Sequence, residues 1–365
     1  MSTVTREQVE QALQGWTEPH LGRDLVAANA LREIAVDDAG SVSVQVALGF
    51  PMSPDARQRL GESVHQVVSA VAGVSAVKIE VDCEVRTHGT HRSTDAVKGV
   101  KNIIAVASGK GGVGKSTCAV NLALALSAEG ARVGILDADI YGPSQPRMLG
   151  ITGKPESPDG KSLQPMVNYD IQSMSAGYLI DEETPMIWRG PMATQALEQL
   201  LRETNWDNLD YLVIDMPPGT GDIQLTLSQK VPVSGAVIVT TPQDIALLDA
   251  RKGLKMFEKV NVPVLGIVEN MSTHICSQCG HEEHIFGEGG GGRMAEQYGI
   301  DLLGSLPLDI RIREQADGGK PTVVADPDGA LACSYREIAL NISARLSLQS
   351  QESASRFPKI VVENT

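Results

Sequence analysis

The pattern of apolar and polar residues changes once along the chain, close to residue 101. In the first part, short runs alternate apolar and polar residues, which predicts strands that bury one face. A proline opens one longer run with helical spacing, as is typical of the first turn of a helix. We therefore predict a small α+β domain over residues 1–85, with strands at 31–36, 42–48 and 77–81 and helices at 9–16 and 54–72.

The second part of the chain has continuous apolar runs instead of alternating ones. Continuous runs predict strands that are covered on both faces. Their alternation with helical patterns predicts an α/β fold, a mostly parallel sheet with helices on both faces. Ligands in such sheets bind beyond the carboxyl ends of the strands. The expected strands are 103–107, 133–136, 211–214, 236–240, 264–268 and 302–304.

Two segments show no apolar period. Residues 86–101 are polar and basic, and we predict that they form a linker. Residues 349–365 are also polar and are predicted to form a flexible tail. The α/β domain is therefore expected to span residues 102–348.

A glycine-rich segment, GKGGVGKST, lies between the first strand of this domain and a helical run. Strand, glycine turn and helix form the context of a phosphate-binding loop, and the segment matches G-x-x-x-x-G-K-[ST] in full. Its N–H groups would surround phosphate oxygens, its second lysine would contact the β- and γ-phosphates, and its serine hydroxyl would bind Mg²⁺. The predicted nucleotide-binding residues are Gly109, Lys110, Gly111, Gly112, Val113, Gly114, Lys115, Ser116 and Thr117.

Carboxylates follow two of the predicted strands. Asp215 follows residues 211–214, and Asp137 and Asp139 follow residues 133–136. A carboxylate at the end of an apolar strand can hold Mg²⁺ directly or through water, and one facing the γ-phosphate can orient the attacking water. Asp215 is therefore a predicted Mg²⁺ ligand together with Ser116. For Asp137 and Asp139, a solvated loop carboxylate is the alternative.

A C-x-x-C motif, Cys276 to Cys279, follows the strand expected at residues 264–268. Two cysteines at this spacing can bind one metal centre. They supply half the ligands of a [4Fe–4S] cluster, and a two-fold axis would supply the other half from a second subunit. A zinc site made of Cys276, Cys279, His281 and His284 is the alternative, although these residues lie closer together than the usual zinc ligand pairs.

These motifs resemble those of known ATPases. GKGGVGKS is similar to the deviant Walker A motif of the dimerising ATPases that include MinD, ParA, the arsenite pump ATPase and the nitrogenase iron protein. The C-x-x-C segment and the glycine run at 289–292 resemble the Mrp/ApbC family of iron–sulfur cluster carriers, with a likeness from about residue 102 to 345. The first domain loosely resembles an iron–sulfur-assembly domain that often precedes such ATPases.

The resemblance implies a homodimer with ATP at the interface, in which Lys110 acts on the nucleotide of the other subunit. It implies that Lys110 and Asp139 are catalytic and that Asp137 supports the Mg²⁺ site. It also implies that Asn270 contacts the adenine, with an asparagine that caps a turn as the alternative. ATP, Mg²⁺ and a [4Fe–4S] cluster are the implied cofactors, with apo-proteins as acceptors and cluster donors upstream.

The composition of the chain limits the classes of partner that the protein is expected to bind. The net charge of −14 argues against non-specific binding to nucleic acid or to an anionic membrane, and no apolar run approaches the roughly 20 residues of a membrane span. Five scattered cysteines favour a reducing compartment, so we expect a cytoplasmic protein. Of these, Cys118 and Cys333 lie in helical patterns and are expected to be buried. The alternative function is a MinD- or ParA-like positioning or regulatory ATPase with a structural zinc site.

Overall fold

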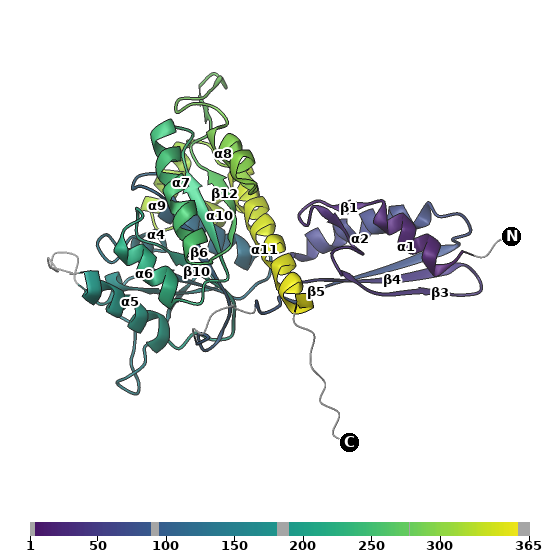
Figure 1. The fold of residues 1–365 in the computed structure, drawn as a ribbon, viewed down its shortest axis with the longest axis horizontal. Coiled ribbons are helices and arrows are strands. Elements are labelled where there is room, and N and C mark those ends of the chain that lie inside the picture. Colours follow the sequence, from purple (N-terminus) through teal and green to yellow (C-terminus); the bar gives the residue numbers. More distant parts are fainter. Residues whose placement is uncertain (1–3, 89–94, 181–189, 277, 357–365) are drawn as a thin grey trace. The chain divides into compact units, whose positions relative to one another are not determined.

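The computed structural model describes residues 4–88, 95–180, 190–276 and 278–356. The chain forms two compact units, of which the first contains the N-terminal residues up to Gly89 together with the chain from Ser343 onward (Figure 1). The second unit spans Thr90–Ile342. Helix α11 (Ala330–Arg356) begins in the second unit and continues into the first.

The C-terminal helix corrects one prediction. A flexible tail was expected from residue 349, but α11 continues to Arg356, so the prediction is wrong for residues 349–356. These residues contain neither glycine nor proline, the residues that commonly end helices, and therefore nothing in the local sequence stops α11. Residues 357–365 lie outside the described part of the chain.

The N-terminal unit has two helices on one face of a three-stranded sheet in the order β3-β4-β5. Strand β4 pairs antiparallel with β3 and parallel with β5. Every second residue of β4 is buried, and the N-cap Ser53 followed by Pro54 starts α2 as the sequence indicated. The elements are α1 (Arg6–Gln14), β1 (Thr17–Glu18), β2 (Arg23–Asp24), β3 (Leu31–Val36), β4 (Ser41–Leu48), α2 (Pro54–Ser69) and β5 (Ala76–Cys83).

The second unit is built on an eight-stranded sheet in the order β15-β12-β11-β6-β10-β7-β9-β8. All neighbouring strands pair parallel except β8, which pairs antiparallel with β9. This confirms the predicted α/β class and all six predicted strands. The strands are β6 (Val100–Ala107), β7 (Val133–Asp137), β8 (Met166–Asn168), β9 (Ile171–Ser175), β10 (Leu209–Asp215), β11 (Gly235–Thr240), β12 (Val264–Glu269) and β15 (Leu302–Ser305).

Two strands of this sheet and one boundary were not predicted. Strands β8 and β9 are short and contain polar residues, so they lack the continuous apolar run that marks the other strands. Strand β6 begins at Val100, inside the segment that was expected to be a linker. Residues 89–94 of that segment lie outside the described residues.

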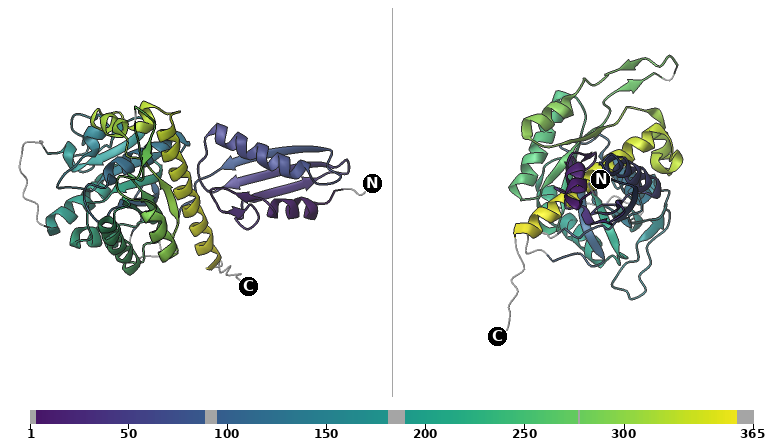
Figure 2. Two further views of the ribbon diagram at one scale, coloured as in Figure 1. Left: turned by 90° about the horizontal axis from the view of Figure 1, so that it is seen from above. Right: turned by 90° about the vertical axis from the view of Figure 1, so that its right-hand side faces the viewer.

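Helices cover both faces of the sheet, as Figure 2 shows from two directions. Leu197 of α5, Leu227 of α6 and Phe257 of α7 pack in one core with residues of β6 and β10. On the other face, α3 contacts β6, β7, β10 and β11, and α11 contacts β15 through the bond from Asn341 Nδ2 to the Leu303 carbonyl. The remaining elements are α3 (Lys115–Ala128), α4 (Gln145–Met148), η1 (Ala176–Tyr178), α5 (Gly190–Glu203), α6 (Asp222–Lys230), α7 (Asp244–Lys259), β13 (His274–Ile275), β14 (Glu282–Glu283), α8 (Gly290–Tyr298), α9 (Ile310–Asp317) and α10 (Thr322–Ala325).

Strands β6, β7, β10, β11 and β12 are parallel, so their carboxyl ends meet at one edge of the sheet. The glycine-rich loop and the predicted carboxylates all follow these ends. In the described residues, every helix is too short or too polar to pass through a lipid bilayer.

Candidate functional site

The glycine-rich loop connects β6 to α3 in the conformation that a phosphate-binding loop requires. Gly114 has φ 83° and directly precedes α3, whose N-terminus carries no side-chain cap. A side chain at Gly114 would collide with the amide of Asn270, and one at Gly109 would collide with the backbone of Asp249 in α7. Glycine at both positions therefore lets the loop pack tightly and leaves its N–H groups available for an anion.

The two predicted phosphate and Mg²⁺ residues Lys115 and Asp215 form a buried ion pair. The Nζ of Lys115 donates to Oδ1 of Asp215 and lies 3.0 Å from Oγ of Ser116. Lys115 is 6% exposed and Asp215 is fully buried. In this arrangement the carboxylate holds the ammonium group at the loop, and a phosphate would compete for the same cation.

A third residue, Gln145, completes this cluster. Its Nε2 donates to Oδ2 of Asp215 at 2.8 Å and to the carbonyl of Ser116 at 3.1 Å. The side chain is fully buried, and its Oε1 has no hydrogen-bond partner among the described residues. Sequence reasoning missed Gln145 because a lone glutamine in a loop carries no motif. The one available signal was its place eight residues after Asp137.

Exchanging Gln145 for leucine is expected to weaken Mg²⁺-dependent hydrolysis. Leucine keeps most of the volume but removes two donors, and a buried acceptor left unpaired costs about 1–3 kcal/mol, or roughly tenfold in rate or affinity. Hydrolysis should be measured against Mg²⁺ concentration. The matched control is Gln224→Leu, because Gln224 is equally buried in α6 and its amide has no partner among the described residues. Equal effects of the two substitutions would contradict the assignment of Gln145.

Asp137 organises the loop that follows β7 and is buried. Burial, and next the charge of Asp215 on the neighbouring strand, raise the pKa of Asp137 to about 7. Two buried carboxylates thus face one buried ammonium group, so a divalent cation would balance the charge of the site, and the donor set of carboxylates and the Ser116 hydroxyl suits Mg²⁺. The carboxylate oxygens of Asp137 accept hydrogen bonds from the backbone N–H groups of Asp139, Ser144 and Gln145 and from Oγ of Ser175.

Asp139 and Lys110 lie at the rim of this cluster. Asp139 is half-buried, and that burial raises its pKa. Lys110 is also half-buried, and its Nζ lies 3.5 Å from Oε1 of Gln243 at the start of α7. Lys110 therefore does not join the Lys115 cluster of its own loop. The adjacent Gly111 and Gly112 are exposed.

The loop after β10 is attached to the start of the phosphate loop. Gly219 has φ 93°, and its N–H donates to the carbonyl of Ser108 at 3.1 Å. Met216 N–H donates to the carbonyl of Val106 at 3.0 Å. The chain from Asp215 onward thus has a defined contact with the phosphate loop, and a γ-phosphate that accepted the Gly219 N–H would replace it.

The two cysteines lie at the tip of a hairpin formed by β13 and β14. Cys276 is half-buried and Cys279 is exposed. The N–H groups of Gln278 and Cys279, followed by the Cys279 thiol, lower the pKa of Cys276 and so favour its thiolate, the form that binds metal. The pair is accessible to a partner, and the exposed Ile275 and Ile285 lie close to it in the sequence.

The structure does not assemble the alternative four-ligand zinc site within one chain. Among the described residues, no group of three or more histidine, cysteine, aspartate or glutamate side chains is placed to hold a metal ion. Nδ1 of His284 lies 3.0 Å from the carbonyl of Ser272 instead. Of the two cysteines predicted to be buried, Cys118 is buried and burial raises its pKa to about 12, whereas Cys333 is exposed, so that prediction is wrong for Cys333.

Asn270 connects the phosphate loop with the cysteine hairpin. Its Nδ2 donates to the carbonyl of Val113 at 2.9 Å, and its own N–H donates to the Thr240 carbonyl at 2.8 Å. Met271 follows in the left-handed region with φ 57°, and the hairpin begins three residues later at His274. The expected adenine contact of Asn270 stays a prediction, and the structure adds a second role for its amide.

Comparison with known proteins finds two families that match successive parts of the chain. Residues 99–343 match the family described as NUBPL iron-transfer P-loop NTPase, and residues 6–81 match the family described as iron-sulfur cluster assembly protein. An iron-sulfur cluster carrier protein of Haemophilus influenzae is 53% identical over 346 residues, which covers 94% of this chain and 93% of the relative. The corresponding protein of Escherichia coli strain K12 is 51% identical over 348 residues, covering 95% and 94%.

Two further relatives match about two thirds of the chain. The iron-sulfur cluster transfer protein NUBPL of Mus musculus is 54% identical over 252 residues, covering 68% of this chain and 79% of the relative. A solved nucleotide-binding protein of Archaeoglobus fulgidus in complex with ADP is 38% identical, covers 63% of this chain and 90% of its own, and superposes with a TM-score of 0.56. The loop, the carboxylates and the cysteine hairpin thus occur on a chain that belongs to the family of NUBPL iron-transfer P-loop NTPases.

Proposed function

We propose that the protein is an ATP-hydrolysing iron–sulfur cluster carrier that binds a [4Fe–4S] cluster between two subunits and transfers it to apo-proteins. The observation that carries the proposal is a pair of accessible cysteines, the half-buried Cys276 and the exposed Cys279, on the same chain as a complete phosphate-loop motif. Relatives of similar length at 51–53% identity are named iron-sulfur cluster carrier proteins. A positioning ATPase with structural zinc, the alternative, leaves the cysteine pair without two further ligands in the described chain.

A homodimer follows from the ligand count. Each chain offers two thiolates at the hairpin tip, and a [4Fe–4S] cluster takes four, so an isologous pair supplies the full set. Exposed Ile275 and Ile285 flank the hairpin, and exposed Ile245 and Leu248 of α7 lie near Gln243, the contact of Lys110. Apolar side chains exposed beside both half-sites are typical of surfaces that a second subunit covers.

In this dimer, residues of both subunits would complete each nucleotide site. Lys115 would leave Asp215 to contact the phosphates of bound ATP, Ser116 and Asp215 would hold Mg²⁺, and Asp137 would support that site. Lys110 of one subunit and Asp139 of the other complete the catalytic apparatus, the first as a charge stabiliser and the second to orient water. Mg²⁺ supplies charge neutralisation at the phosphates when it is bound. Five scattered cysteines and a cluster cargo suit a reducing compartment, so we propose that the protein works in the cytoplasm.

Coupling between the two sites would run through Asn270. A change at the Val113 carbonyl on nucleotide binding reaches Asn270 directly, and Ser272 beyond it is tied to the Leu306 carbonyl by both its N–H at 2.9 Å and its Oγ at 3.1 Å. The hairpin with Cys276 follows. Two sites that bias one shared element are coupled in free energy, which gives ATP a way to alter cluster retention.

Reconstitution and transfer test this function. Protein reconstituted anaerobically with iron and sulfide should show the broad visible absorption of a cluster and pass it to an apo-acceptor, at a rate that ATP changes in the wild type. Asn270→Ala should keep the cluster and lose about tenfold or more of the ATP effect, because the link to Val113 is gone. A colourless protein with stoichiometric zinc would contradict the carrier function. Equal rates with and without ATP in the wild type would contradict only the coupling.

A further inference from the structure

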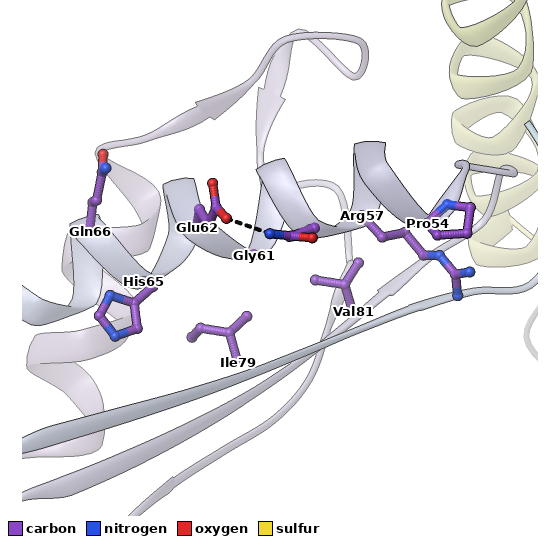
Figure 3. A pocket seen from close by; sticks show the side chains of 9 residues that line it. Pro54, Arg57, Gly61, Glu62, His65, Gln66, Ile79 and Val81 are labelled. Carbon is purple, nitrogen blue, oxygen red and sulfur yellow. Dashed lines mark hydrogen bonds between the residues drawn. The ribbon is translucent and has the colours of Figure 1, made fainter.

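Helix α2 and strand β5 of the N-terminal unit leave an open groove between them, with a volume of about 740 Å³ (Figure 3). Ile79 and Val81 of β5 face the helix along the groove, with Arg57 beside Pro54 at one end and His65 toward the other. Apolar surface predominates in the lining, and the polar residues Gln58 and Glu62 of α2 contribute to it between these ends. Neither the phosphate loop nor the cysteine hairpin contributes to this groove, so the function proposed above leaves it without a role.

Strand β5 is an edge strand with a regular backbone. It pairs with β4 over its whole length, Ala76–Cys83, without a bulge, and no described strand pairs with its other edge. Its inward side chains are only half-buried, whereas those of β4 at the same level are fully buried. The outer edge of β5 over Ala76–Asp82 presents N–H and C=O groups that pair with no described strand, which is the arrangement that accepts an added strand.

Gly61 keeps the groove open. It lies in the interior of α2, where glycine costs about 1 kcal/mol relative to alanine. A Cβ at this position would lie 3.8 Å from Cγ2 of Val81 and 4.0 Å from Cγ2 of Ile79, so alanine would fit and any longer side chain would fill the space above the strand.

Arg57 supplies an unpaired cationic donor at the Pro54 end of the groove. Its Nε is buried and has no hydrogen-bond partner among the described residues. A buried donor without a partner is costly, and a carboxylate is the group that pairs with a guanidinium most strongly. Glu62 of α2 also lines the groove, so a ligand with further acidic groups would be repelled there.

We propose that this groove binds an extended peptide segment of an acceptor protein as a fourth strand on β5. Apolar side chains of the peptide would lie over Ile79 and Val81, and a single carboxylate would pair with Arg57. Because Val81 and Arg57 lie at the same end, a peptide whose C-terminal carboxylate reaches Arg57 runs parallel to β5 (Figure 3). The assignment of the peptide to an acceptor protein rests on the proposed function. The assignment of a peptide site rests only on the shape and the lining of the groove.

The test measures peptide binding to the full-length protein without nucleotide or cluster, so its outcome is independent of the carrier function. The probes are two fluorescent eight-residue peptides of alternating serine and valine that end in leucine or phenylalanine, each as free acid and as amide. We expect the acids to bind about tenfold more tightly than the amides by fluorescence anisotropy. Hydrogen exchange should slow at the backbone amides of Ala76–Cys83 when peptide is bound.

Matched substitutions on α2 separate this site from general effects. Arg57→Gln should abolish the difference between acid and amide, while Arg59→Gln, on an exposed residue outside the groove, should preserve it. Gly61→Leu should lower affinity at least tenfold, and Gly61→Ala should have little effect. The proposal is overturned if neither acid binds at about 1 mM, if acid and amide bind alike, or if Gly61→Leu binds as the wild type does. It is also overturned if Gly61→Leu dissociates an oligomer, since the groove would then hold a second copy of the chain.

Discussion

Replacement of Lys110 by alanine is expected to lower ATP hydrolysis by about 10³–10⁵ while nucleotide affinity stays nearly unchanged. Lys115 is buried in the loop, where it is predicted to bind the subunit's own phosphates, whereas the Lys110 side chain lies at the rim with its Nζ 3.5 Å from Oε1 of Gln243. In the proposed dimer, Lys110 stabilises charge that develops on the other subunit's nucleotide in the transition state. Phosphate release measures the rate, and a fluorescent ATP analogue measures the affinity.

A mixing experiment distinguishes action across the dimer from action within one subunit. Lys110→Ala and Asp139→Ala are both expected to be inactive and to bind ATP. A mixed dimer contains one chain of each variant. The active site on its Lys110→Ala chain keeps an intact Asp139 and receives an intact Lys110 from the other chain, whereas the second site lacks both residues. Random mixing makes about half of the dimers heterodimers, so activity should return to about a quarter of the wild-type value.

Lys252→Ala is the matched control for Lys110→Ala, because Lys252 is a largely exposed lysine of α7 whose ion pair with Asp249 lies on the surface. We expect wild-type hydrolysis from this variant, since exposed ion pairs contribute little. Absence of recovery at every mixing ratio would contradict catalysis in trans. A parallel loss of ATP affinity in Lys110→Ala would show that the lysine binds ground-state phosphates.

Exchange of Cys276 and Cys279 for serine is expected to reduce bound iron from about four per dimer to nearly none after reconstitution. Serine keeps the size and the hairpin backbone but replaces thiolates with hydroxyl groups, which are poor ligands for iron at neutral pH. The hairpin N–H groups lower the pKa of the Cys276 thiol, whereas a serine hydroxyl at the same position would stay protonated at neutral pH. Iron and sulfide analysis together with the visible absorption spectrum check this result.

Cys333→Ser provides the matched control, because Cys333 is exposed in the same unit but lies in helix α11. It should retain the full iron content. Four irons per dimer in the double serine variant would assign the cluster to other ligands. Iron loss from Cys333→Ser to the same degree would indicate a general failure of reconstitution.

Much of the architecture could be predicted because the responsible signals are local. The continuous apolar runs at β6, β7, β10, β11, β12 and β15 marked the buried sheet, and Pro54 marked the start of α2. The phosphate loop was recognisable for the same reason, because its glycines, lysine and serine lie within one short segment at the fixed spacing that phosphate binding requires. The missed strands β8 and β9 are short and partly polar, and their place in the sheet depends on pairing with β7.

The sequence therefore established the α/β class, the nucleotide loop and the cysteine pair, all of which depend on neighbours within a few residues. The fold alone revealed Gln145 between Asp215 and Ser116, the bond from Asn270 to Val113, and the exposure of Cys333. The atoms of the first two contacts are separated by 29–157 residues along the chain. The packing of strands and helices determines which side chains from distant parts of the sequence are buried together. The same packing determines that the edge of β5 and the groove between α2 and β5 stay open.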